Sequence, residues 1–252
     1  MNLRENAMAI YNRQQPDFYG DLMQAVELIP DPVMMGDMPP QDGKEHADSW
    51  GTIYLFPPGA PGPHPRVNAS NAVIKDIEKW EEQLKVPSLK GLDWTLAEQV
   101  ASSINRDEKF VCFMFGGGLF ERSHHLMGME TALINYLEYP DEMAALLRVI
   151  ADYKIEYIQM VAEHTHPDII FYHDDWGSKQ NLFLPPRVWR SIIKPLQKEI
   201  SDVIHDCGMI YMHHADCICQ PIVTDMVEIG VDIWQGVIAQ NDIVEIQRIT
   251  EG

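Results

Sequence analysis

Short apolar runs that alternate with long helical patterns constrain the fold of this chain more than any other feature of its sequence. The four largely apolar runs lie at 110–115, 169–172, 209–212 and 231–234. Between them, one helical pattern begins at Pro140 and keeps an apolar stripe, and another opens at Pro185 and ends at Gly208. Strands that are apolar on both faces and alternate with helices are typical of a parallel sheet with right-handed crossovers. The sequence therefore predicts an α/β fold, either a doubly wound sheet or a barrel.

The N-terminal part of the chain is less regular. Prolines gather at 30–40 and again at 57–65, which excludes continuous helices and central strands there. The stretch 50–56 predicts one strand, and helices are expected from about Ala72 to Leu84 and over 92–104. We expect one domain over 1–252. It comprises an irregular arm with helices at 1–105 and regular βα units at 106–252.

Composition excludes several classes of protein. The 252 residues include 19 Lys and Arg against 38 Asp and Glu, a formal net charge of −19. This acidity argues against nucleic acid and against anionic membrane surfaces, both of which attract clustered cations. No apolar run approaches the roughly 18 residues of a transmembrane helix, and residues 1–13 do not form a signal peptide. Four cysteines are too few for a disulfide framework, so we expect a cytoplasmic protein.

Residues capable of chemistry follow each of the later strands. These are Gly116, Gly117 and Gly118 with Arg122, then 173–177 (HDDWG), 213–217 (HHADC) and Gln235. In parallel α/β folds the carboxyl ends of the strands form the active face, so we expect these side chains to meet. The alternative is that loops after strands are polar in any case.

Two groups of candidate catalytic residues stand out. His214, Asp216 and Cys217 offer an imidazole, a carboxylate and a thiolate, a set that suits zinc. No CxxC pair accompanies them, and Cys217 can also be read as a small buried hydrophobe. Asp174 and Asp175 are adjacent, so only one of them is expected to enter a pocket, as a general acid or base. The other is expected to cap a helix.

Candidate substrate contacts come from the same strand ends. Arg122 could bind a carboxylate, or form a salt bridge with no role in binding. Gly117 lies in a run that lacks the spacing of phosphate-binding loops, so its role is to let the backbone turn sharply or approach a ligand. His173, Trp176 and Gln235 are counted with them because of their position.

The later sequence resembles a known superfamily. The segments HDDWG (173–177), LPPRVW (184–189), IIKPL (192–196) and HADC (214–217) are similar to the uroporphyrinogen decarboxylase superfamily, as are HHLMGME (124–130) and DMVEIGVDIWQGV (225–237). The resemblance covers most of the chain after Asp107 and implies a (β/α)8 TIM barrel. Such a barrel needs eight strands and we count five or six. We therefore expect the last barrel strands to be missing from this sequence, with any final metal ligand.

The superfamily implies two chemistries. Its decarboxylases act without a cofactor on a tetrapyrrole with eight carboxylates, which they hold with an arginine-rich N-terminal segment. Here residues 1–37 contain only Arg4 and Arg13. Its corrinoid-linked methyltransferases hold zinc with a His-x-Cys pair at this strand end and a later Cys. In this sequence His214 matches the His, Asp216 stands in the Cys position, and Cys217 is displaced by one residue.

These comparisons of motif and charge lead to one prediction and two alternatives. We predict a corrinoid-linked methyltransferase that moves a methyl group between a small substrate or thiol and a corrinoid protein. His214 with Asp174 or Asp175 would be catalytic, and zinc would be held by His214, Asp216 and Cys217. The alternatives are decarboxylation of a tetrapyrrole and a non-catalytic domain that binds a corrinoid or a partner subunit. An acidic surface with an apolar proline-rich arm is compatible with a homodimer.

Overall fold

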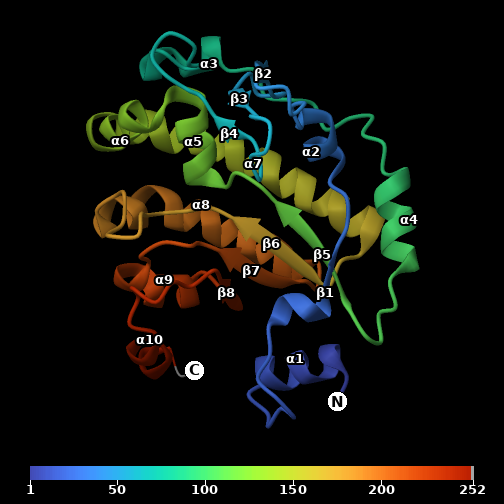
Figure 1. The fold of residues 1–252 in the computed structure, drawn as a ribbon. Helices are drawn as coiled ribbons and strands as arrows, with labels where there is room; N and C mark the ends of the chain where they lie inside the picture. Colours follow the sequence, from blue (N-terminus) through green and yellow to red (C-terminus); the bar gives the residue numbers. More distant parts are fainter. Residues whose placement is uncertain (251–252) are drawn as a thin grey trace.

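A five-stranded parallel sheet forms the centre of the protein, in a computed structural model that describes residues 1–250 (Figure 1). Its strand order is β1-β5-β6-β7-β8, and every neighbouring pair is parallel. The strands are β1 (Val26–Leu28), β5 (Phe110–Phe115), β6 (Ile169–His173), β7 (Ile210–His214) and β8 (Ile233–Gln235). The four apolar runs of the sequence are therefore confirmed as strands. The predicted α/β class is also confirmed, and within the described residues the sheet is open between β1 and β8.

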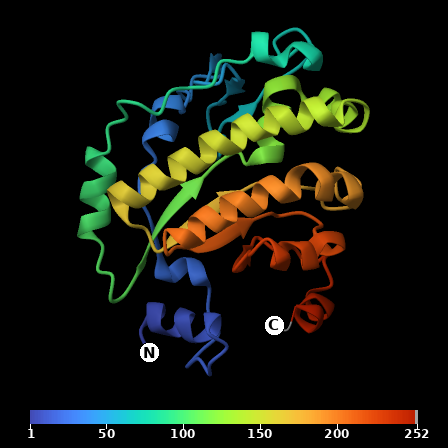
Figure 2. The ribbon, with the colours of Figure 1, turned by 180° about the vertical axis from the view of Figure 1, so that it is seen from behind.

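Long helices cover one face of this sheet. They are α5 (Leu119–Met127), α6 (Met129–Glu138), α7 (Pro140–Thr165) and α8 (Pro186–Asp206). Three short helices come later in the chain: η3 (Gln220–Ile222), α9 (Val223–Glu228) and α10 (Ile243–Ile249). Helices α7 and α8 lie side by side across the sheet, as Figures 1 and 2 show from opposite sides. Pro140 and Pro186 each occupy the first turn of a helix, where no backbone donor is needed. Helices α5 and α6 are separated at Gly128, whose φ is +87°.

The sheet is apolar on both faces, as its sequence predicts. In β5, Val111, Phe113 and Phe115 point toward the layer of long helices. Phe110 and Cys112 point the other way, into a smaller cluster that includes residues of α1 (Leu3–Tyr11). This alternation follows from the two-residue period of a strand and places the polar side chains at the strand ends.

After β1, the N-terminal part forms an arm of short elements along the long helix α7. After η1 (Leu22–Ala25), its elements are α2 (Pro32–Asp37), a small antiparallel sheet of β2 (Glu45–Ala47), β3 (Ile53–Leu55) and β4 (His64–Pro65), then η2 (Ile77–Lys79), α3 (Trp80–Gln83) and α4 (Thr95–Ser103). The strand expected within 50–56 is β3, and the helix expected over 92–104 is α4. The helix expected from Ala72 is shorter, because Asp76 caps η2 and the residues before it are irregular.

The two ends of the parallel sheet are covered differently. At the amino ends of the strands, Arg4 of α1 donates to the Lys109 carbonyl (2.9 Å) and to Asp168 (2.8 Å). At the carboxyl ends lie α2 and the small sheet, next to the long helix α7 (Figure 1). Among residues 1–250 no helix has both the length and the apolar content needed to cross a membrane.

Candidate functional site

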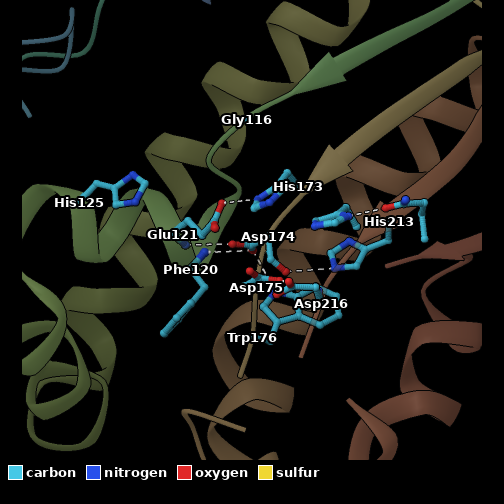
Figure 3. Close-up of polar contacts among 12 residues, drawn as sticks. Gly116, Phe120, Glu121, His125, His173, Asp174, Asp175, Trp176, His213 and Asp216 are labelled. Carbon is cyan, nitrogen blue, oxygen red and sulfur yellow. Dashed lines mark hydrogen bonds and ion pairs between the residues drawn. The ribbon is translucent and has the colours of Figure 1, made fainter. Parts of the chain in front are cut away.

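Three ionisable side chains meet where β5 and β6 end (Figure 3). Glu121 lies in the first turn of α5, His173 is the last residue of β6, and Asp175 follows two residues later. One ligand atom from each lies within 4.8 Å of the other two. We call these three residues the rim cluster. In the described part of the chain it is the one group of three or more such side chains close enough to share a metal ion.

The rim cluster is partly buried and held together by charge. His173 Nδ1 and Glu121 Oε2 are 2.9 Å apart. Burial lowers the pKa of His173, but the hydrogen bond and negative charge of Glu121 outweigh it and raise the pKa to about 9. Burial raises the pKa of Asp175, and the charge of Glu121 adds to this effect. The rim cluster therefore combines two acidic side chains with a histidine whose pKa is raised to about 9.

Asp174 has a different place from its neighbour. Its carboxylate is fully buried and accepts hydrogen bonds from the backbone amides of Phe120 (3.1 Å) and Glu121 (2.9 Å) and from Trp176 Nε1 (2.9 Å). Burial raises the pKa of Asp174 to about 7. The carboxylate thus caps the amino end of α5 and fixes Glu121 against β6. Of the two aspartates, Asp175 reaches the rim cluster, and Asp174 supports it from beneath.

The close fit of Asp174 explains one of the glycines after β5. A Cβ atom on Gly118 would lie 2.3 Å from the Asp174 Cβ, whereas a Cβ on Gly116 would meet nothing within 4 Å. Real atoms do not approach to 2.3 Å without a bond, so Gly118 is required for α5 to begin at this point. Gly117 has a φ of +61° and turns the chain toward the cavity described below.

His214 extends the rim cluster on the β7 side. Its ring stacks on that of His173 with a centroid separation of 4.4 Å and an interplanar angle of 21°. Its Nδ1 is hydrogen-bonded to Gln235 Oε1, which fixes the ring between the ends of β6 and β8. A Cβ on Gly236 would lie 2.9 Å from the His214 ring, so this glycine leaves room for the histidine. Two predicted residues, His214 and Gln235, are therefore brought together.

The three residues expected to hold zinc are not brought together as one group. The Cys217 side chain is buried, and its Sγ lies 3.5 Å from Cys219 Sγ. The Asp216 residue is exposed, and its backbone amide donates to Asp175 Oδ1 (2.9 Å). Of the three side chains, only that of His214 contacts the rim cluster, by stacking on His173.

Trp176, a predicted substrate contact, is also buried. It stacks on His213 with ring centroids 4.0 Å apart and donates to Asp174. His213 is enclosed with it, and burial lowers the pKa of His213 to about 3. Both rings are buried, and they pack beneath the carboxyl ends of the strands.

A cavity of about 260 Å³ lies between the arm and the carboxyl end of β5. It contains two predicted residues, Gly117 and Arg122, and it shares the first turns of α5 with the rim cluster because Arg122 follows Glu121 directly. Its other principal walls are Asp31, Met34, Trp50, Tyr54, Tyr153, Lys154 and Tyr157. The rim cluster and the cavity together form the candidate active site.

Sequence reasoning missed Glu121 and Lys154. Glu121 is adjacent to Arg122, which the sequence singled out, so its position three residues after the glycine run was the available signal. Lys154 lies among the apolar residues of α7, next to Tyr153, and a charged residue on that stripe was the only sign of it.

The fold and the rim cluster define a class: an α/β protein of barrel type with its polar site at the carboxyl ends of parallel strands. The family model for uroporphyrinogen decarboxylase (URO-D) matches residues 51–247, and the chain belongs to this family. Among solved structures, the fold is similar to a methyltransferase from Methanosarcina mazei, with a TM-score of 0.61 and 11% identity over 93% of this chain and 75% of that one. No curated protein matches the sequence significantly.

Proposed function

We propose that this chain is a methyltransferase of the URO-D family that moves a methyl group between a small substrate and a corrinoid protein, with zinc held at the rim cluster. The observation that carries the proposal is the meeting of Glu121, His173 and Asp175 within 4.8 Å at the carboxyl ends of the strands. The methyltransferase with a similar fold supports the reaction type, and the family supports an enzyme.

The donor set of the rim cluster fits zinc. One imidazole nitrogen and two carboxylate oxygens are common zinc ligands, and three protein ligands leave a position for substrate. The contact between His173 Nδ1 and Glu121 Oε2 also fits, because a cation bound by both atoms would take the place of the hydrogen-bonding proton. When bound, zinc supplies Lewis-acid chemistry, by which an oxygen or sulfur atom of a substrate is polarised.

The residues around the rim cluster have distinct roles in this proposal. Because Gln235 Oε1 is an acceptor, Nδ1 of His214 carries a proton and Nε2 is left with a lone pair. His214 can therefore accept a proton from a thiol or return one to a leaving oxygen. Asp174 keeps the first turn of α5, and with it Glu121, in place.

The cavity favours a small substrate over a tetrapyrrole. A volume of about 260 Å³ lies just below the usual range of roughly 300–1,000 Å³ for ligand sites. Two basic side chains, Arg122 and Lys154, line it together with three carboxylates, and Arg122 is already paired with Asp48 at 2.7 Å. A substrate with eight carboxylates would find few partners there.

Free cobalamin in place of the corrinoid protein tests the proposal. The zinc-loaded protein is mixed either with methylcobalamin and a small thiol or with cob(I)alamin and an aryl methyl ether, and the change of cobalt state is followed by absorbance. We expect one of these reactions, and a loss of about 100-fold or more in His214→Gln and His173→Ala. His164→Gln, at an exposed ion pair on α7, is the matched control.

Three outcomes would contradict the proposal. The first is that neither reaction exceeds the protein-free rate. The second is release of carbon dioxide from uroporphyrinogen by the same protein, which would favour the decarboxylase alternative. Tight binding of cobalamin without turnover, unchanged by His214→Gln, would favour the non-catalytic alternative.

A further inference from the structure

The cavity beside the rim cluster has walls that are mostly flat and apolar. Trp50 and Tyr153 meet edge to face with ring centroids 4.9 Å apart, and Tyr54 and Met34 also face the cavity. Arg122 lies over the Trp50 ring at 5.2 Å. Such walls suit a molecule with an apolar body, for which the aromatic faces provide contact area.

The acidic residues of the cavity are already engaged. Asp31 accepts from the amides of Val33 (2.8 Å) and Met34 (3.0 Å), and from Tyr157 Oη (2.6 Å). Asp37 accepts two hydrogen bonds from Ser49. Asp48 accepts from Arg122 and from the backbone amides of Trp50 and Thr52. These hydrogen bonds hold the arm in shape, and they occupy both carboxylate oxygens of Asp37 and of Asp48 and the Oδ1 atom of Asp31.

The hydrogen-bond donors of the cavity, in contrast, are in surplus. Tyr153 is 7% exposed, and its Oη has no hydrogen-bond partner among residues 1–250. The Nε of Arg122 is also buried without a partner in the same range. Lys154, 5% exposed, makes one hydrogen bond within the described chain, from Nζ to the Gly116 carbonyl (3.0 Å), which leaves two of its three donors.

Buried donors without partners are costly, and three around one cavity point to a ligand that supplies acceptors. Around Lys154 lie the charges of Arg122 and of Asp31, Asp174 and Glu121. The three carboxylates favour the protonated lysine. Burial opposes them and lowers the pKa of Lys154 to about 7, so an anionic oxygen beside Nζ would stabilise the charge.

We propose that this cavity binds a small organic acid in which one carboxylate accepts from Lys154, Arg122 and Tyr153 and an apolar, flat body packs on Trp50. The inference rests on the proposed function in that it names the substrate class of the same site. One carboxylate matches the arrangement, since Arg122 is shared with Asp48 and Lys154 is the one remaining cation on the wall.

Calorimetric titration with benzoate tests this inference, and it needs no turnover. Benzyl alcohol has a similar body without the charge and serves as the ligand control. We expect benzoate to bind and benzyl alcohol to bind at least about tenfold more weakly. Lys154→Met should weaken benzoate binding at least about tenfold, while Lys85→Met, at an exposed lysine, should leave it unchanged.

Tyr153→Phe provides a second variant, in which the hydroxyl group is removed and the ring that packs on Trp50 is kept. Because Tyr153 Oη has no partner in the free protein, its removal should not lower the midpoint of thermal unfolding, yet it should weaken benzoate binding several-fold. Equal affinity for benzoate and benzyl alcohol, no benzoate binding, or benzoate binding unchanged in Lys154→Met and Tyr153→Phe would overturn the inference.

This test separates the two proposals. Benzoate binding that depends on Lys154, in a protein without methyl transfer, would leave the cavity assignment standing and remove the proposed function. Methyl transfer in a protein that does not bind benzoate would support the proposed function and remove the cavity assignment.

Discussion

Asp174 gives the sharpest quantitative prediction, because a fully buried carboxylate with a raised pKa makes stability depend on pH. The folded-state pKa of about 7 lies above the ordinary value of 3.8. The folded protein therefore binds this proton more tightly than the unfolded chain does. The resulting stabilisation is fully present below about pH 4 and is lost as the pH rises through about 7. Between pH 5 and pH 6 the loss is about 1.4 kcal/mol, and it becomes smaller with each further pH unit as the pH reaches the folded-state pKa.

Asp174→Asn cannot titrate and should not show this loss. Between pH 5 and pH 8, the free energy of unfolding of the unmodified protein should fall by on the order of 3 kcal/mol more than that of Asp174→Asn. Urea unfolding at both pH values measures the difference, and Asp206→Asn, at an exposed aspartate, is the matched control. Parallel curves for the unmodified protein and Asp174→Asn would refute the assignment of Asp174 as a carboxylate with a raised pKa.

Asp174→Ala tests the other part of this reasoning, the three hydrogen bonds. Their loss leaves the amides of Phe120 and Glu121 and the Trp176 indole without a partner in a buried place. At pH 5 we expect a loss of about 3–5 kcal/mol in the free energy of unfolding. A loss below about 1 kcal/mol would mean that this carboxylate does not hold the start of α5.

Three further predictions concern the surroundings of the site. Gly118→Ala should lower the free energy of unfolding by about 3 kcal/mol or more, because the added methyl group overlaps Asp174. Gly116→Ala, where a Cβ meets nothing within 4 Å, should change it by less than about 1 kcal/mol. Urea unfolding compares the two variants, and equal losses would contradict the described packing. Tyr157→Phe removes the hydrogen bond that ties α2 to α7 and should cost about 1–2 kcal/mol, and a thermal midpoint equal to that of the unmodified protein would argue against this tie. Benzoate affinity should fall as the pH rises from 6 to 9, because Lys154 loses its proton near pH 7; in calorimetry, the same pH profile in Lys154→Met would assign the effect to another group.

The strand that the sequence predicts most accurately is buried on both faces. Phe110–Phe115 is apolar at every position and is the strand β5, with the boundaries that the sequence predicts. β1 was missed because it has three residues and only Val26 is buried, so neither alternation nor an apolar run marks it. The N-terminal helices α1 and α2 were missed for a related reason, since their boundaries are set by the caps Asn2 and Asp31 and not by an apolar stripe.

The site was predictable to the extent that it depends on strand ends. His173, Asp175, His214 and Gln235 come together because neighbouring parallel strands end at one edge, a property that residue order alone reveals. Contributions from helices were not predictable in the same way. Glu121 enters the rim cluster because Gly118 allows α5 to begin against Asp174, and this depends on three-dimensional packing.

The metal ligands are the point at which sequence and geometry differ most. The family resemblance favours His214, Asp216 and Cys217, whereas the side chains that meet are those of Glu121, His173 and Asp175. In the loop after β7, the Cys217 side chain faces Cys219 in the interior, whereas Asp216 reaches Asp175 through its backbone amide.

The central claim, a metal held by the rim cluster, is tested most directly by the zinc content of purified protein and of matched variants, measured by elemental analysis after zinc loading and dialysis. The account predicts stoichiometric zinc in the unmodified protein and in Cys217→Ala, and loss of zinc in His173→Ala and Asp175→Asn. Zinc that is kept in His173→Ala and lost in Cys217→Ala would contradict it and return the metal to the ligand set favoured by the family resemblance.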